Sequence, residues 1–325
     1  MNTVTSNQLN TYKMLCRARD NNVLTIMSNF LKTKYNNVIQ TSEYIMAQGT
    51  IPVALVAHAD TVFKSPPRHF FYDQKQTVMW SPEGAGADDR AGVFAIMQIL
   101  KLTNLRPHII ITTGEEIGCI GASKLIGDYP VFPWELKFMI QLDRRGKEDC
   151  VFYDCNNFDF QHFIESFGFK TAYGSLSDIS VLAPCWRIAA VNLSVGYYNE
   201  HSCAEFLCFT FLLATIEKVK NVLNFVASSP EIEPYLYIPM DTNSNLWSGL
   251  RQCDNCYNYV TEEEMIPVRV EALNGETRNL CIECFSSNSH HISYCSKCSI
   301  PWIAAEDHNL NDQWFCPDCA KGRKN

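Results

Sequence analysis

Four apolar runs of this sequence lead into histidine or acidic residues. The runs, with the polar residues that follow each, are 53–57 with His58, 109–113 with Glu115 and Glu116, 138–142 with Asp143, and 188–193 with His201. A strand buried inside a parallel sheet has this continuous apolar composition, and ligands of open α/β sheets collect beyond the carboxyl ends of the strands. We therefore expect one edge of a sheet to gather carboxylates and imidazoles, which together suit a metal ion with nitrogen and oxygen ligands.

The order of the predicted elements indicates an α/β fold. A helical pattern at residues 7–34 is followed by strands that alternate with helices, and a long last helix is expected at 203–226, with Glu205 near its start. This alternation predicts a mostly parallel mixed sheet sandwiched by helices. Three prolines between residues 230 and 239 indicate a linker. We expect a first domain at 1–228, a linker at 229–249 and a small cysteine-rich module at 250–325.

The bulk composition excludes several classes of protein. A hydrophobic fraction of 46% and a charged fraction of 19% over 325 residues are those of a folded globular chain. The formal net charge of −8 argues against a general polyanion binder, and no apolar run is long enough to span a membrane. The first residues show no basic stretch followed by an apolar one, so we expect no export signal and a cytoplasmic protein.

Eight of the fifteen cysteines lie after residue 250, all in Cys-x-x-Cys pairs. The pairs are Cys253 with Cys256, Cys281 with Cys284, Cys295 with Cys298, and Cys316 with Cys319. In a chain without an export signal, this spacing predicts zinc sites of four thiolates rather than disulfides. We expect two zinc ribbons whose pairs combine in sequence order, and an interleaved cross-brace is the alternative.

The charge of this module bears on its partner. From residue 251 onwards the sequence has eleven Asp or Glu and seven Lys or Arg, and four thiolates around each Zn²⁺ would add about two further negative charges per site. This balance disfavours nucleic acid. We expect the ribbons to contact a protein partner or to gate a substrate, and a purely stabilising appendage is the other interpretation.

The polar residues at the predicted sheet edge form a complete set for two divalent cations, which need a shared carboxylate, a histidine and a carboxylate on each ion, and a base that is not a ligand. The predicted ligands are His58 and Asp143 for one metal, Glu116 and His201 for the other, and Asp88 between the two. Glu115 is then the general base that takes a proton from a metal-bridging water. Asp60 is expected to hydrogen-bond His58 and fix its tautomer.

Three of these segments resemble motifs of the co-catalytic zinc exopeptidases, the superfamily of peptidase T, aminoacylase, glutamate carboxypeptidase and the bacterial leucyl aminopeptidases. They are residues 58–62 (His-Ala-Asp-Thr-Val), 86–92 (Gly-Ala-Asp-Asp-Arg-Ala-Gly) and 113–118 (Thr-Gly-Glu-Glu-Ile-Gly). With Asp143 and His201 they complete the family's order of ligands over roughly residues 50–206. The resemblance implies the same metal and base roles, two catalytic zinc ions, and a cis peptide bond after Asp88.

One departure from the family concerns its lid. Lid-bearing members such as peptidase T insert a separate domain between the fourth and fifth ligands, whereas only the 57 residues from 144 to 200 separate Asp143 from His201 here. A further domain has little room in that span. We therefore expect a lidless catalytic domain.

The sequence thus predicts a metal-dependent hydrolase of peptide or N-acyl amino acid amide bonds, with an aminopeptidase favoured. Zinc is the expected catalytic metal, with cobalt or manganese as alternatives, and two further zinc ions are expected in the cysteine sites. Peptides or acyl-amino acids are the expected substrates. The alternative is a catalytically retired, peptidase-like scaffold or binding protein that uses its zinc ribbons for interaction.

Overall fold

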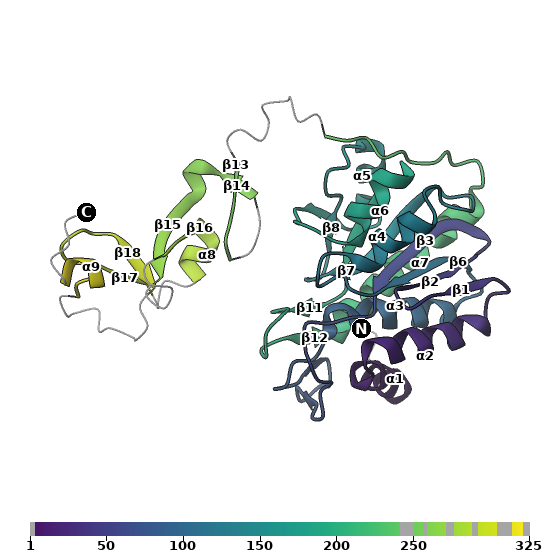
Figure 1. Ribbon diagram of the computed structural model, residues 1–325, viewed down its shortest axis with the longest axis horizontal. Coiled ribbons are helices and arrows are strands. Elements are labelled where there is room, and N and C mark those ends of the chain that lie inside the picture. The colour runs from purple at the N-terminus through teal and green to yellow at the C-terminus, as the bar shows by residue number, and fades with distance from the viewer. Residues whose placement is uncertain are drawn as a thin grey trace. The chain divides into compact units, whose positions relative to one another are not determined.

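The computed structural model describes residues 4–240, 250–255, 259–270, 276–287, 292–303 and 314–320. The chain forms two compact units, Met1–Met240 and Asp241–Asn325 (Figure 1). Each unit has its own sheets and its own apolar clusters.

The first unit is built on an eight-stranded sheet of order β1-β2-β6-β3-β7-β10-β8-β9. In that order the strands are β1 (Val38–Gln40), β2 (Tyr44–Ala47), β6 (Pro107–Thr112), β3 (Ile51–His58), β7 (Phe138–Arg144), β10 (Ala190–Ser194), β8 (Asp149–Val151) and β9 (Lys170–Ala172). The central strands β6, β3, β7 and β10 are parallel, whereas β1, β2 and β8 pair in antiparallel fashion. The prediction of a mostly parallel mixed sheet is confirmed.

Helices cover both faces of this sheet (Figure 1). The apolar cluster on one face includes side chains of α1 (Ser6–Arg17), α2 (Asp20–Lys32), α3 (Ala87–Leu102), α5 (Phe158–Glu165) and α7 (Phe209–Ser228), and the cluster on the other includes α4 (Ile120–Asp128) and α6 (Asp178–Trp186). Successive residues of β3 reach opposite faces, so Leu55 packs in the first cluster and Val56 in the second. Burial on both faces explains why the strands are continuous apolar runs.

The helical pattern at residues 7–34 belongs to two helices, not one. The chain leaves α1 at Ala18 and enters α2 after Arg19, and the backbone of both residues is extended. None of the helices among the described residues is long and apolar enough to cross a membrane.

A smaller antiparallel sheet of order β11-β12-β5-β4 lies in the same unit. Its strands are β11 (Tyr197–Tyr198), β12 (Phe206–Cys208), β5 (Val78–Trp80) and β4 (Phe71–Tyr72). Strand β12 pairs with β11 on one side and with β5 on the other, which attaches the turn between β11 and β12 to this sheet. That turn carries His201.

The first part of the segment predicted as a linker at 229–249 belongs to the first unit. The first unit extends to Met240, because Tyr235 donates a backbone hydrogen bond to Lys137 at 2.9 Å and Leu236 forms a β-bridge with Ile188. The start of this segment therefore packs along the first unit. Residues 241–249 lie outside the described part of the chain.

The second unit is made of short strands. Its sheet of order β16-β15-β18-β17 uses β16 (Glu276–Cys281), β15 (Met265–Val270), β18 (Pro301–Ile303) and β17 (Ile292–Tyr294), and β13 (Leu250–Gln252) pairs with β14 (Tyr259–Thr261). Short helical segments follow at η2 (Glu262–Glu264), α8 (Ile282–Ser287) and α9 (Pro317–Ala320). Its two apolar clusters are small and both contain cysteines. Domains with so little apolar core commonly depend on a bound metal.

Gly92 of α3 lies so close to β7 that no side chain fits. A Cβ at this position would lie 1.9 Å from the backbone oxygen of Leu142, so we expect Gly92→Ala to destabilise the first unit by about 1–3 kcal/mol. Gly127→Ala in α4 is the matched control, because nothing lies within 4 Å of its added Cβ, and it should be neutral or stabilise by up to about 1 kcal/mol. Urea unfolding followed by tryptophan fluorescence measures both, and equal stability of the two variants would contradict the close packing.

Candidate metal centre

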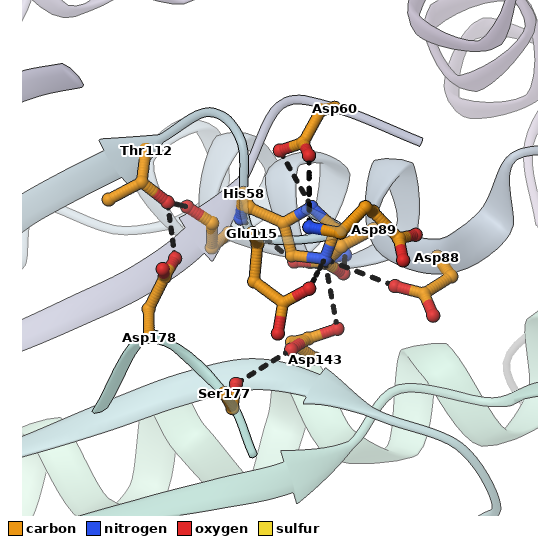
Figure 2. Close-up of polar contacts among 12 residues, drawn as sticks. His58, Asp60, Asp88, Asp89, Thr112, Glu115, Asp143, Ser177 and Asp178 are labelled. Atoms are coloured by element: carbon orange, nitrogen blue, oxygen red, sulfur yellow. Dashed lines mark hydrogen bonds and ion pairs between the residues drawn. The ribbon is translucent and has the colours of Figure 1, made fainter. Parts of the chain in front are cut away.

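His58, the last residue of β3, lies at the centre of a buried polar cluster (Figure 2). Its Nε2 is 3.1 Å from Oδ1 of Asp88 and 3.4 Å from Oδ1 of Asp143. Its Nδ1 is 3.2 Å from Oδ1 of Asp60, whose Oδ2 accepts a hydrogen bond from the backbone N–H of Glu116 at 3.1 Å. Asp60 therefore connects the loop after β3 to the loop after β6.

His201 forms a second group on the other side of Asp88. Its Nε2 is 2.8 Å from Oε2 of Glu116 and 3.3 Å from Oδ2 of Asp88. The two oxygens of Asp88 thus face different imidazoles, Oδ1 toward His58 and Oδ2 toward His201. The Glu115 carboxylate lies beside the first group, with Oε2 at 3.9 Å from Nε2 of His58. The structure brings together all the predicted His, Asp and Glu site residues.

The loop that carries Asp88 is held at the start of α3. The peptide bond between Asp88 and Asp89 is cis, as the resemblance implied. Glu205 accepts hydrogen bonds from the backbone N–H groups of Ala87 at 3.0 Å and Asp88 at 3.2 Å. The prediction that Glu205 begins the last helix is wrong, because α7 begins only at Phe209. Its carboxylate instead lies at the positive end of α3, a long-range contact that local spacing does not reveal.

Asp143 is oriented by the neutral side chains of Gln141, Ser177 and Tyr197. Nε2 of Gln141 and Oγ of Ser177 each donate to Oδ2 of Asp143 at 3.0 Å, and the hydroxyl of Tyr197 lies 3.3 Å from Oδ1. Gln141 shares a face of β7 with Asp143, so the two-residue period of a strand could have identified it. Ser177 and Tyr197 come from distant segments, and no sequence pattern connects them to Asp143.

The cluster holds more carboxylates than its two imidazoles neutralise. Burial raises the pKa of Glu115 to about 9 and that of Asp143 to about 7, and nearby carboxylates add to both shifts. For Asp88 burial is opposed by hydrogen bonds from the two imidazoles, which hold the pKa of that carboxyl below its usual range. Hydrogen bonds to Asp88 and Glu116 raise the pKa of His201 to about 11.

These donors fit divalent cations. Oε1 of Glu116 is buried and has no hydrogen-bond partner among the described residues. The donor atoms of His58, Asp88 and Glu116 lie within 4.8 Å of one another and could hold one ion, as could those of His58, Asp89 and Asp143. Imidazole nitrogens and carboxylate oxygens are donors that zinc and related ions accept, and a cation would offset the cost of these buried charges. The side chain of His201 is 52% exposed, so the cluster opens to solvent on that side.

The cysteines of the second unit form two groups in sequence order. Cys295, Cys298, Cys316 and Cys319 make one group that could hold a metal ion, and Cys253, Cys281 and Cys284 make the other. Backbone N–H groups point at the sulfurs, as in the bond from Cys281 to Sγ of Cys253 at 3.2 Å. Cys256 lies outside the described residues. The interleaved alternative does not occur among the described cysteines.

Comparison with solved structures identifies the fold of the first unit. A tripeptidase from Staphylococcus aureus subsp. aureus Mu50 has a TM-score of 0.57 and 15% identity, with 68% of this chain and 98% of that chain covered. Aminopeptidase PepT from Bacillus cereus has a TM-score of 0.55 and 14% identity, with 68% and 98% covered. A TET aminopeptidase from a marine sediment archaeon, Thaumarchaeota archaeon SCGC AB-539-E09, has a TM-score of 0.55 and 12% identity, with 69% and 99% covered. The chain therefore has the zinc exopeptidase fold that its motifs predicted.

No family model matches the sequence, and no curated protein matches it. The likeness is thus carried by the arrangement of strands and helices and by the few motifs at the strand ends.

The shift in the pKa of Glu115 predicts how the metal-free protein responds to pH. The folded state keeps the Glu115 proton up to about pH 9, whereas the ordinary pKa is 4.5. The folded state binds more protons between these values, so the free energy of unfolding falls as the pH rises through this window. Glu115→Gln removes this titration and should make the fall less steep. Urea unfolding in chelator at about pH 6 and about pH 8.5 tests this, and an identical pH dependence of wild type and variant would contradict it.

Proposed function

We propose that the first unit is a metal-dependent peptidase, and specifically an aminopeptidase that acts on short peptides. The observation that carries this proposal is the orientation of Asp88, whose two carboxylate oxygens face His58 and His201 at 3.1 and 3.3 Å. A carboxylate between two ligand groups is what a pair of cations requires. The solved structures with this fold support the reaction class, since they include a tripeptidase and aminopeptidases. Hydrolysis of N-acyl amino acids uses the same chemistry and is the alternative substrate class.

The proposed ligand set follows the two groups around Asp88. His58 and Asp143 would hold one ion, Glu116 and His201 the other, and Asp88 would be shared. Zinc is proposed, with cobalt or manganese as alternatives. When bound, the two cations would supply Lewis acidity toward the attacking water and the amide carbonyl.

The protein itself would move the protons. Glu115 lies next to the ligands without belonging to the close pairs, and its carboxylate is the proposed base that accepts a proton from the attacking water. The same carboxyl group would then pass this proton to the nitrogen of the leaving amine. Asp60 would hold the Nδ1 proton of His58, so that the Nε2 lone pair faces Asp88 and Asp143.

The cysteine groups are proposed to hold two structural zinc ions, one in each group, with Cys256 completing the first. In this proposal the ribbons contact a protein partner. A retired peptidase that keeps only the ribbons as an interaction module is the second candidate for the chain as a whole. The buried carboxylates of the cluster are unfavourable to retain without a cation, which favours the enzyme.

Glu115→Gln tests the proposed base. The amide cannot accept the proton, so turnover should fall by about 10²–10⁴-fold while the metal content stays unchanged. Tripeptides and aminoacyl and N-acyl chromogenic substrates, assayed with zinc, cobalt or manganese, measure the turnover. Glu231→Gln is the matched control, since Glu231 is exposed and far from the cluster in sequence. Normal activity of Glu115→Gln would refute the assignment of the base.

Metal content separates the two candidate functions. We expect about four metal ions per chain, two in the His and carboxylate cluster and one in each cysteine group. Replacing Cys295 and Cys316 together by serine should lower the count by about one and leave peptidase turnover measurable. A count of about two, unaffected by Asp88→Asn, would favour the retired scaffold.

A further inference from the structure

A cavity of about 240 Å³ lies where the turn between α1 and α2 meets the loop after β3. Residues of both segments line it, together with Gly86 and Arg90 from the start of α3. None of the residues that could hold a metal in the first unit lines this cavity. The cavity is smaller than pockets for drug-sized ligands, which begin at about 300 Å³, and so suits a small molecule or ion.

Arg90 contributes a buried charge to the cavity wall. Its side chain is 2% exposed, and its Nη2 donates to the backbone oxygen of Ala18 at 3.1 Å and to Oδ1 of Asp20 at 2.8 Å. Nε and Nη1 are buried without a hydrogen-bond partner among the described residues. A buried guanidinium with unused N–H groups is costly unless something accepts those hydrogen bonds.

Two further features supply donors at the same place. Oγ1 of Thr61, which also lines the cavity, is buried and has no partner among the described residues. Helix α2 begins at the cavity, and no side chain caps its first N–H groups. The uncapped end of a helix carries a partial positive charge and favours anions.

The charges around the cavity also favour an anion. Its lining includes the cationic side chains of Arg19, Lys64 and Arg90 and one carboxylate, that of Asp20. Cys16 adds no charge, because burial raises the pKa of its thiol to about 12. The lining is therefore positive by two formal charges, three cations less one anion.

We propose that this cavity binds a phosphate-class oxyanion, either free phosphate or the phosphate group of a small metabolite. A phosphate group carries up to two negative charges and has enough oxygens to accept from Arg90, Thr61 and the N-terminus of α2 together. A carboxylate has one charge and two oxygens, and it leaves part of this donor set unused. The proposal does not rest on the proposed peptidase activity.

Two residues that line the cavity lie close to metal-cluster residues in the sequence. Thr61 directly follows Asp60, and Gly86 precedes Asp88 by two residues. An anion that orders the loop after β3 and the start of α3 would act on segments that present His58 and Asp88. Phosphate bound in this cavity would therefore influence the positions of His58 and Asp88 without contacting them.

Isothermal titration of the full, metal-loaded chain tests the proposal, with inorganic phosphate, glycerol phosphate and acetate as separate ligands. We expect phosphate to bind and acetate to bind at least about tenfold more weakly. Binding of glycerol phosphate as tight as that of phosphate identifies a phosphorylated metabolite as the ligand, and binding of phosphate alone identifies the free ion. Failure of both, or equal binding of acetate, overturns the proposal.

Variants locate the binding. Arg90→Met should weaken phosphate binding by about tenfold or more, and Thr61→Val, which keeps the side-chain shape, by about threefold or more. Lys64→Gln should weaken it by about two- to fivefold, whereas Lys75→Gln, an exposed lysine outside the cavity, should change nothing. Lys64 is exposed, and Thr61→Val keeps the shape of the side chain, so we expect both variants to fold. The test therefore does not depend on whether Arg90→Met folds. Phosphate binding that survives these changes but disappears in chelator belongs to the metal cluster and overturns the proposal.

Discussion

The constraint on which the site of the first unit depends is the burial of several carboxylates close to one another at the edge of a sheet. Glu115 and Asp143 both have raised pKa values because water is excluded from them and other acids lie close. Hydrogen bonds from Gln141 and Ser177 fix the orientation of Asp143, and two imidazoles oppose the repulsion at Asp88. The arrangement costs stability in the absence of a cation. The side chains that lower the stability of the metal-free unit are therefore the ones that carry its proposed chemistry.

The sheet order explains why the cluster forms at this point. Strand β3 lies between β6 and β7, so His58 at its end lies between the loop with Glu115 and Glu116 and the end of the strand that carries Asp143. All of these strands run in the same direction and are buried on both faces, which makes the platform rigid. His201 comes from a different element, because it lies in a turn of the smaller antiparallel sheet. A single parallel sheet thus supplies most of the cluster, and a second sheet completes it.

The parts of this structure that were predictable from sequence are those that depend on local pattern. Continuous apolar strands indicated a sheet buried on both faces, and the motifs around His58, Asp88 and Glu116 indicated which strand ends meet. Contacts between distant segments were not predictable in this way. Glu205 reaches the start of α3 across more than a hundred residues of sequence, and Tyr235 ties the presumed linker to Lys137. The unsatisfied nitrogens of Arg90 likewise exist only because the fold buries that side chain.

The two imidazoles of the cluster are presented by very different pieces of backbone. His58 ends a central strand and is itself buried, whereas His201 lies in a surface turn with a left-handed φ of 62° and a half-exposed side chain. Water can reach an imidazole on such a turn directly. An ion held by His201 and Glu116 would therefore exchange with the medium faster than one held by His58 and Asp143. Where metal is scarce, chains of this protein would accumulate in a singly loaded form, and the free concentration of the metal would set the fraction that is fully assembled.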